Sequence, residues 1–339
     1  MRKIFQPRFI GIAICLLSLK FISCNYCGDE TPLRLAGTAT NLEALNSPYD
    51  DWNCADMRVH FYPSMYFLFS SNRNNKGGTF DLIHHQMDLY SNTFDADVYL
   101  SIDETSSYQY ENEVIRLAKT INTDQDELGP SIIIMDGYSD GFTFSRGDSN
   151  NHDLWILYSP DSTMDLSWAL YNDKTTEEPI TVLNSSADDG YLTYHKPSHS
   201  LIFHSSRSGV YRLYQAKLPT EKTLKELIKS PFELEIIELE ELSSPDGEER
   251  TPFILDNTLY FISTRTGGFG GRDIWKSDWD SSSGWTSVTN LGSKINSSED
   301  EYRPMVLDVD GNSNFKRVIF FSSNRDGGLG GYDLYYSGL

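Results

Sequence analysis

The feature that most constrains the fold is a phrase that occurs twice near the C-terminus. It reads LYFISTRTGGFGGRDIW at residues 259–275 and IFFSSNRDGGLGGYDLY at residues 319–335. Looser copies read YFLFSSNRNNKGGTFDLI at 66–83, FTFSRGDSNNHDLWIL at 142–157 and LIFHSSRSGVYRLYQ at 201–215. A period of about sixty residues that carries strand, Gly-rich turn and strand together is typical of a repeat architecture. The chain therefore contains five copies of one structural unit.

A second phrase recurs in the same phase. It has an apolar residue, then Asn, Ser or Thr, then acidic residues, and its copies begin at Leu45, Ile121, Leu183, Leu242 and Ile295. Two independent markers in one phase make a chance match improbable. The arginines of the first phrase, Arg73, Arg146, Arg207, Arg265 and Arg325, are spaced by 73, 61, 58 and 60 residues. The excess length in the first unit indicates a loop insertion.

Each unit is predicted to consist of β-strands. The apolar runs at 259–262 and 318–321 are rich in aromatic and β-branched residues and are bounded by turn residues, as buried strands with hairpin connections are. Four antiparallel strands per unit suit an all-β propeller, in which radial repetition leaves only short, protected edges. We predict five blades, with six as the alternative. A series of β-sandwiches is disfavoured, because a lone unit of this size would bury only about 60% of its unfolded surface. Residues 220–229 are the only predicted helix.

The last copy stops directly after its third strand, and the missing piece occurs at the other end of the chain. TNLEALNS at 40–47 matches TNLGSKINS at 289–297. We therefore predict that the N-terminal segment pairs with the third strand of the last copy and closes the ring. This pairing would remove an open sheet edge, which could otherwise template aggregation.

Residues 1–23 differ from the rest in composition. They contain four basic residues, no acidic residue and an apolar run at 9–19 that is long enough for a signal peptide but too short to cross a bilayer. The phrase Phe-Ile-Ser-Cys that ends at Cys24 resembles a bacterial lipobox, although Lys20 departs from that pattern. Cys24 is thus a candidate for lipidation, with simple cleavage near Ser23 as the alternative. The predicted organisation is a signal peptide at 1–23, a tether at 24–36 and a propeller at 37–339, in an exported outer-membrane lipoprotein on the periplasmic or cell-surface side.

Cysteine content and charge add two constraints. Cys27 and Cys54 are the only cysteines left after Cys24, and export would permit a disulfide between them, although nothing fixes their distance. Without residues 1–23 the chain has 24 basic and 49 acidic residues, a net charge of −25. Such a surface repels nucleic acid and anionic lipid. The only membrane contact expected is through the lipid anchor.

The phrases FSSNRDGGLGGYDLY and FISTRTGGFGGRDIW resemble the TolB-like, or WD40-like, propeller repeat of periplasmic proteins. The resemblance runs from about Leu45 onward and is strongest in the fourth and fifth units. These units are longer than the usual length of about forty residues. Similar units occur in exported lipoproteins of the Bacteroidetes type. The resemblance implies a non-enzymatic scaffold that binds another envelope protein or a glycan, without a cofactor.

The polar residues of the first phrase recur at fixed places. Arg73 and Asp81, Arg265 and Asp273, and Arg325 and Asp333 are each eight residues apart. The second unit has Arg146 and Asp153, and the third has Arg207 but Arg212 in place of the acid. A residue needed once for catalysis should appear once. Recurrence instead indicates a structural role, either as Arg–Asp pairs or as caps of backbone groups in the turns.

The acidic residues of the second phrase are the candidate lining of the central channel. They are Asp50, Asp126, Asp188, Asp246 and Asp300, near the start of each predicted inner strand. In a five-bladed glycoside hydrolase, acids from several blades would converge there as general acid and as base or nucleophile. Because these acids also repeat, none stands out as catalytic. We therefore predict a binding scaffold rather than an enzyme, with no metal site, and keep the glycoside hydrolase as the alternative.

Overall fold

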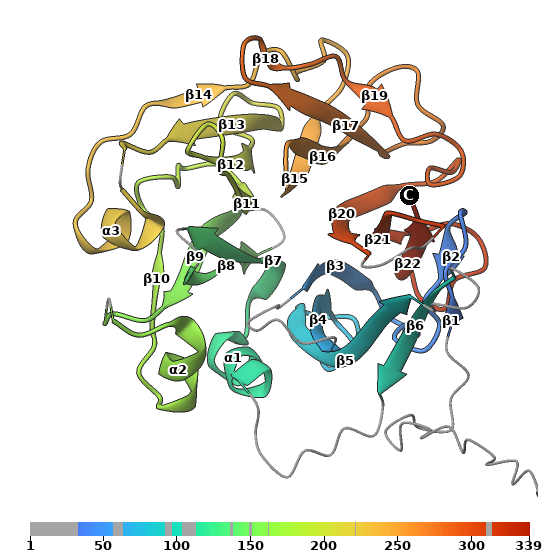
Figure 1. Cartoon of the computed structure of the whole chain (residues 1–339), viewed down its shortest axis with the longest axis horizontal. Helices are drawn as coiled ribbons and strands as arrows, with labels where there is room; N and C mark the ends of the chain where they lie inside the picture. The colour runs from blue at the N-terminus through green and yellow to red at the C-terminus, as the bar shows by residue number, and fades with distance from the viewer. Residues whose placement is uncertain are drawn as a thin grey trace, which may run out of the picture. The chain divides into compact units, whose positions relative to one another are not determined.

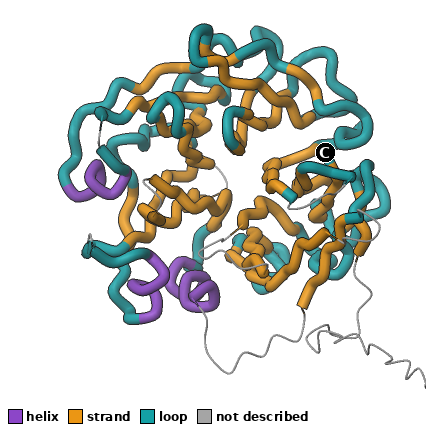
Figure 2. Tube along the Cα trace, in the orientation of Figure 1, coloured by secondary structure: helices purple, strands orange, loops and turns teal. Residues whose placement is uncertain are grey.

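Five antiparallel sheets, one for each sequence repeat, stand around a central axis in the computed structural model (Figures 1 and 2). The structure describes residues 33–56, 64–91, 97–103, 113–135, 138–148, 151–161, 163–220, 222–309 and 314–339. The inner strand of each blade contacts that of the next blade, and the fifth contacts the first. The predicted all-β propeller with five blades is therefore confirmed, and the six-bladed alternative is wrong.

The strands run from the axis outward in chain order within each blade. The first two blades contain β3 (Asp51–Asp56), β4 (Ser64–Ser71), β5 (Asp81–Ser91) and β6 (Val98–Asp103), then β7 (Asp126–Met135), β8 (Tyr138–Asp148), β9 (Asn151–Tyr158) and β10 (Thr176–Pro179). The third and fourth contain β11 (Asp189–His195), β12 (Ser200–Ser205), β13 (Arg212–Lys217) and β14 (Ile236–Glu238), then β15 (Glu249–Leu255), β16 (Thr258–Ser263), β17 (Asp273–Asp280), β18 (Gly284–Trp285) and β19 (Thr289–Asn290). The fifth contains β20 (Glu301–Asp308), β21 (Arg317–Ser323) and β22 (Asp333–Gly338).

Two edges depart from the regular pattern. The strand β1 (Leu33–Arg34), which precedes the predicted start of the propeller at residue 37, pairs with β6 and adds a fifth strand to the first blade. In the fourth blade, the polar outer strand is divided into β18 and β19, and both pair with β17. Each of these outer strands is only two residues long, so little unpaired edge is left.

The described residues form three helices, whereas the sequence predicted one. The helix α3 (Leu224–Lys229) lies within the predicted segment and begins with a capping box made by Thr223 and Glu226. The helices α1 (Glu113–Ile121) and α2 (Leu166–Tyr171) lie in insertions. The prediction of a single helix is wrong because it did not take into account the helical apolar stripe of α1, in which Val114, Leu117 and Ile121 are buried. None of the described helices is long and apolar enough to span a membrane.

The N-terminal segment closes the ring as predicted. The strand β2 (Thr40–Asn41) pairs with β22, with Thr40 opposite Tyr336 and Asn41 opposite Tyr335. Asn46 accepts a hydrogen bond from the backbone N–H of Leu334 and donates one to its carbonyl. Asn296 makes the same two bonds with Ile274. The joint between the two ends of the chain is therefore chemically the same as a joint between covalently linked blades.

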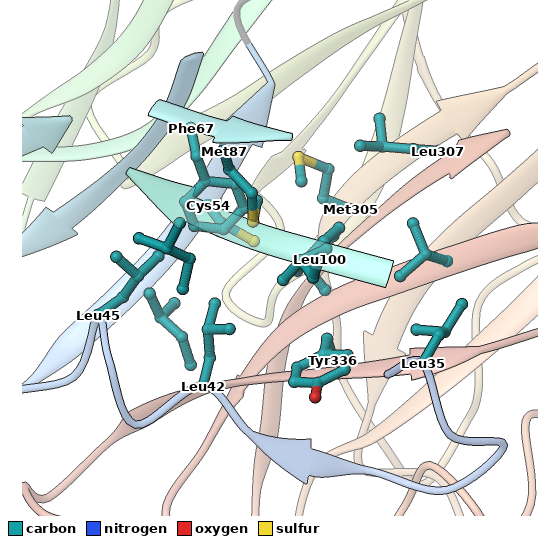
Figure 3. Packing of buried hydrophobic residues seen from close by; sticks show 14 of the residues in the cluster. Leu35, Leu42, Leu45, Cys54, Phe67, Met87, Leu100, Met305, Leu307 and Tyr336 are labelled. Atoms are coloured by element: carbon teal, nitrogen blue, oxygen red, sulfur yellow. The ribbon is translucent and has the colours of Figure 1, made fainter. Parts of the chain in front are cut away.

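Apolar residues of the first and fifth blades form the core behind this closure. Leu42 and Leu45 of the N-terminal segment pack with Phe67 and Tyr336, all 2% exposed or less (Figure 3). Cys54 lies in the same cluster, and burial raises the pKa of its thiol to about 12. Burial of Leu42 and Leu45 therefore holds the N-terminal segment in place in addition to its strand pairing with β22.

Candidate active site

Two consecutive acidic residues stand at the start of every inner strand. The second residue of each pair is fully buried and points into the blade; these residues are Asp51, Glu127, Asp189, Glu249 and Glu301. The first residue is half-buried at the mouth of the channel; these residues, which we call the rim acids, are Asp50, Asp126, Asp188, Glu248 and Asp300. Because side chains alternate along a strand, neighbours in sequence have opposite environments.

The repeated arginines bind the buried acids. Arg73, Arg146, Arg207, Arg265 and Arg325 lie 2.6–3.0 Å from Asp51, Glu127, Asp189, Glu249 and Glu301 in turn. Each guanidinium also donates to a backbone carbonyl of the linker that precedes its inner strand. Each lies over a phenylalanine ring of its own blade, at 4.9–5.3 Å. This clamp fastens every inter-blade linker to the blade that follows it.

The acid eight residues after the arginine is not its partner. Asp273 accepts hydrogen bonds from the N–H groups of Phe269 and Gly270, and Asp333 does the same for Leu329 and Gly330. These carboxylates cap the Gly-rich turns. Asp81 is reached by the side chain of Asn74 at 3.4 Å. Asp153 lies directly opposite Arg146 in the β8–β9 pair, without an ion pair between them.

Four of the five predicted rim residues lie at the mouth, and one does not. Asp50, Asp126, Asp188 and Asp300 directly precede the buried acids. Asp246 lies outside this ring, where it is exposed and bonded to Ser244 and to the N–H of Thr266. Glu248 takes the fourth position instead. The acidic run of this linker offers three candidate carboxylates, and only the strand register distinguishes them.

A variable position of the repeat supplies the other side chains of the mouth. This position directly precedes the third strand of each blade, where the second blade's β9 is counted from Asp153. From the first blade to the fifth, the residues are Phe80, His152, Tyr211, Arg272 and Tyr332. All five contact a rim acid through the backbone or the side chain. The same location therefore carries a different chemistry in most blades.

His152 is the residue that most clearly breaks the fivefold pattern. Its Nδ1 lies 3.4 Å from Asp188 Oδ1, and its Nε2 lies 3.9 Å from Asp126 Oδ2. Burial alone would lower the pKa of His152, but the two carboxylates raise it to about 9. Burial alone would raise the pKa of Asp188, but its bonds with His152 and Tyr211 lower it to about 2. At neutral pH the site therefore holds an imidazolium beside an ionised carboxylate.

The rim acids differ in how far their oxygens are already engaged. Asp188 binds His152 through Oδ1 and accepts a hydrogen bond from Tyr211 through Oδ2, at 2.6 Å. Asp300 and Glu248 are both bound by Arg272. Asp126 accepts only the backbone N–H of Phe80, on Oδ1, so its Oδ2 has no hydrogen-bond donor among the described residues. Asp126 is accordingly the rim acid best placed to react.

Aromatic rings form one wall of the mouth. Trp52 stacks between Phe80 and Tyr302, at 5.0 and 5.3 Å, and Tyr332 meets its edge at 4.9 Å. Four buried N–H donors near this wall have no hydrogen-bond partner in the described part of the chain: Trp52 Nε1, His152 Nε2, Arg250 Nε and Arg272 Nε. The partly exposed rings of this wall suit a ligand with an apolar face, whereas the four donors are buried in the free protein.

Side chains close the channel below the mouth. Tyr191 of the third blade donates to Asn53 of the first, at 3.0 Å, and Arg303 of the fifth blade donates to the carbonyls of Pro130 and Pro252. Asn53, Tyr191 and Arg303 all have positive φ, at bulges of their inner strands. Such backbone costs about 1–3 kcal/mol per residue and persists only where the surroundings hold it. These bonds across the axis, which we call the plug, separate the channel into two mouths.

Sequence reasoning missed His152, Tyr211 and Glu248. For His152 and Tyr211 a sequence signal was available: the residue directly before the start of each third strand varies between the repeats, whereas the residue that follows it is an acid in four of the five. A position that varies in this way has no structural role common to all blades.

Among the described residues, no three His, Cys, Asp or Glu side chains are arranged to hold a metal ion. Cys54 has no disulfide partner among the described residues, and Cys24 and Cys27 lie outside them, so lipidation of Cys24 and the Cys27–Cys54 disulfide stay predictions.

No family model matches this chain, and no curated protein matches it. Among solved structures, it is similar to an endo-arabinase from Bacteroides thetaiotaomicron, with 13% identity, a TM-score of 0.49 and coverage of 89% of this chain and 97% of that one. It is also similar to a structure described as a glycoside hydrolase (9%, 0.48, covering 90% and 91%). A family 117 glycoside hydrolase from Zobellia galactanivorans matches at 10%, with a TM-score of 0.39 and coverage of 90% and 88%.

These findings correct two predictions. The resemblance to TolB-like repeat proteins is wrong, since no family model supports it and the matched structures are described as glycoside hydrolases. The expectation of a non-enzymatic scaffold is wrong for the same reason. The recurring Arg and Asp residues that suggested this family are the structural clamps and turn caps described above. With identities of 13% or less and TM-scores below 0.5, the chemistry of this chain has to come from its own residues.

Proposed function

We propose that this protein is a glycoside hydrolase whose active site is the acidic mouth of the propeller. The observation that carries the proposal is His152 between Asp126 and Asp188. It supplies what the repeated acids alone lack, namely one proton donor that differs from every other group of the ring. Titratable groups whose environments push their pKa values apart, here to about 9 and about 2, are typical of acid–base sites.

The arrangement supports a division of roles. His152 carries a proton at neutral pH, and we assign it as the group that protonates the oxygen of the leaving sugar. Its Nε2 is buried in the free protein, so this step requires the site to open around the substrate. Asp126 Oδ2, 3.9 Å away, can attack the anomeric carbon as the bond to that oxygen breaks. Water then attacks the same carbon, releases Asp126 and returns a proton to His152. Asp188 and Tyr211 are positioning residues, because they hold the imidazole charged and oriented.

The spacing favours direct attack over a water-mediated step. The carboxyl pairs of inverting glycosidases stand about 6.5–9.5 Å apart, which leaves room for a water molecule, whereas those of retaining enzymes stand about 5–5.5 Å apart. The 3.9 Å between Asp126 Oδ2 and His152 Nε2 joins a carboxylate and an imidazole rather than two carboxyl groups, and it is too short for a water molecule to stand between them. We therefore propose hydrolysis with retention of anomeric configuration.

The walls of the mouth support a sugar as the substrate. A pyranose or furanose ring presents an apolar C–H face, which can lie on the partly exposed Tyr332 ring, and hydroxyl groups, which can donate to the rim acids. The negative balance of the rim acids disfavours an anionic sugar. A neutral glycan fits both features.

The deciding experiment is hydrolysis by the purified protein of a panel of neutral polysaccharides, arabinan included, and of chromogenic aryl glycosides. We expect release of reducing sugar from at least one member, with retention in the product seen by NMR. The variant His152→Gln should lose this activity while Asp246→Asn, which changes an exposed acid outside the ring, should keep it. Activity that survives in His152→Gln, or no activity on any neutral glycan, would contradict the proposal.

The location of the protein remains part of this proposal. We propose an exported lipoprotein anchored through Cys24, which would place the site where extracellular or periplasmic glycans are met. Incorporation of labelled palmitate into the wild type, and its loss in Cys24→Ala, is the expected result. Secretion of an unlipidated chain cleaved near Ser23 would overturn the anchor without affecting the proposed chemistry.

A further inference from the structure

A second cavity lies on the far side of the plug from the rim acids. It has a volume of about 340 Å³ and is lined by the later halves of the inner strands. Its wall is mainly apolar and includes Ile132, Phe253 and Leu307. This size falls at the lower end of the roughly 300–1,000 Å³ of small-molecule sites, which are also mostly apolar with a few polar groups.

Arg303 is the charged group that reaches this cavity from the plug. It lines the cavity, yet only 1% of its surface is exposed. It donates to two backbone carbonyls, those of Pro252 and Pro130, and its Nε has no acceptor. No carboxylate of the described residues forms an ion pair with it. By contrast, all five clamp arginines have one.

The other polar groups near Arg303 do not neutralise it. Cys54 lies close enough to interact electrostatically, but burial raises the pKa of this thiol to about 12, so it is uncharged at neutral pH. Asp308, at the edge of the cavity, is bound by Arg317 at 3.0 Å. The rings of Tyr191 and Phe253 lie 5.4 and 5.8 Å from the guanidinium and offer only cation–π attraction.

A buried charge without a counter-ion strongly destabilises the state that contains it. An arginine cannot escape this cost by losing its proton at physiological pH. The free protein therefore holds an uncompensated positive charge at the inner end of an apolar cavity. Binding that supplies a negative charge there, and covers the apolar wall at the same time, would remove both unfavourable features.

We propose that this cavity is a binding site for a small amphipathic carboxylate, with its carboxylate on Arg303 and its apolar body along Ile132, Phe253 and Leu307. The planar guanidinium fork matches a carboxylate, and a single cation among apolar groups suits one negative charge rather than a phosphate dianion. The site is separate from the proposed glycan site, because the Tyr191–Asn53 bond and Arg303 itself lie between them.

Isothermal titration calorimetry with octanoate, octanol and octylamine tests this proposal. We expect octanoate to bind at least about tenfold more tightly than octanol, since a charge-assisted hydrogen bond contributes about 1.5–3 kcal/mol. Octylamine should not bind detectably. In Arg303→Met, octanoate should lose its advantage over octanol. Lys217→Met, which removes an exposed cation away from the cavity, should behave as the wild type.

A second variant keeps the test independent of whether Arg303→Met folds. Ile132→Trp leaves Arg303 in place and fills the cavity from its wall, so it should weaken octanoate binding by at least about tenfold, as lost pocket volume removes the apolar contacts. Equal affinity for octanoate and octanol in the wild type would overturn the proposal. So would the absence of octanoate binding, or octanoate binding that Ile132→Trp leaves unchanged.

Discussion

The two acids that begin each blade are neighbours in sequence but have opposite surroundings. The buried acid meets the same partners in all five blades, namely an arginine that lies above a phenylalanine ring and a backbone N–H of the linker. The rim acid one position earlier meets different partners: a backbone N–H at Asp126, an imidazole and a phenol at Asp188, and a guanidinium at Asp300. Adjacent residues therefore form two different rings, a uniform ring of buried acids and a varied ring of rim acids.

This difference teaches where function can reside in a repeat protein. A residue that recurs with the same contacts in each blade stabilises the fold of that blade. A site for one reaction needs groups that occur only once. The buried acids satisfy the first description. His152 and its two carboxylates satisfy the second, although they use positions that the repeat provides in every blade.

The largest effect is expected from the varied ring. Asp126→Asn keeps the shape of the side chain but removes the proposed nucleophile, so kcat on the best glycoside should fall by roughly 10²–10⁴-fold or more. The free energy of unfolding should fall only by the loss of the 3.9 Å ion pair with His152, because Asp126 has no ion pair with an arginine. Kinetics on the chromogenic substrate, together with chemical denaturation, would measure both. Asp246→Asn is the matched control, and a loss of activity below about tenfold would refute the role of Asp126.

The opposite outcome is expected from the uniform ring. Glu301→Gln leaves Arg325 without its carboxylate and weakens the bond to Ser297, so unfolding should become easier by about 3–5 kcal/mol, as for other broken buried pairs. The folded fraction should keep its kcat. Urea denaturation followed by tryptophan fluorescence measures the loss. Should Glu301→Gln be as stable as the wild type while losing activity, the contrast between the two rings would fail.

Much of the fold was predictable because the repeat carries its own phase. The Arg and Asn markers located each blade, and the match between 40–47 and 289–297 predicted the closing strand that β2 forms. The helices α1 and α2 were not predicted, since they lie in insertions that share nothing with the repeat.

The site was predictable only in part. Four rim acids follow from their place in the second phrase, but Asp246 was chosen where Glu248 occupies the ring, because local sequence does not fix the strand register in an acidic run. His152 was missed because its meaning depends on Asp188 of the next blade. A contact between blades is set by how the sheets stand around the axis, which no local pattern encodes.

A smaller effect tests whether uniform positions are interchangeable. Asn46→Ala removes the two bonds to Leu334 at the closure, and Asn296→Ala removes the equivalent bonds to Ile274. Each variant should lose about 1–3 kcal/mol of unfolding free energy, the cost of leaving buried backbone groups without partners. Thermal and urea unfolding of the pair would compare them. Equal losses would show that the closure is an ordinary joint, whereas no loss in Asn46→Ala would mean that strand pairing alone holds it.

The smallest effect is on the pH dependence of kcat/KM. It tests whether Asp188 keeps His152 charged or only packs against it. The raised pKa of His152 means that its proton, and the stability of its ion pairs, are fully present below about 6.5 and are lost as pH rises through about 9. The kcat/KM of the wild type should therefore decline on the alkaline side near pH 9. In Asp188→Asn one of the two carboxylates that raise the pKa is neutral, so this limb should move toward 6.5 while activity at pH 6 is largely kept. A residue that only packs would lower activity equally at every pH, and an unmoved limb would show that Asp188 does not hold the charge of His152.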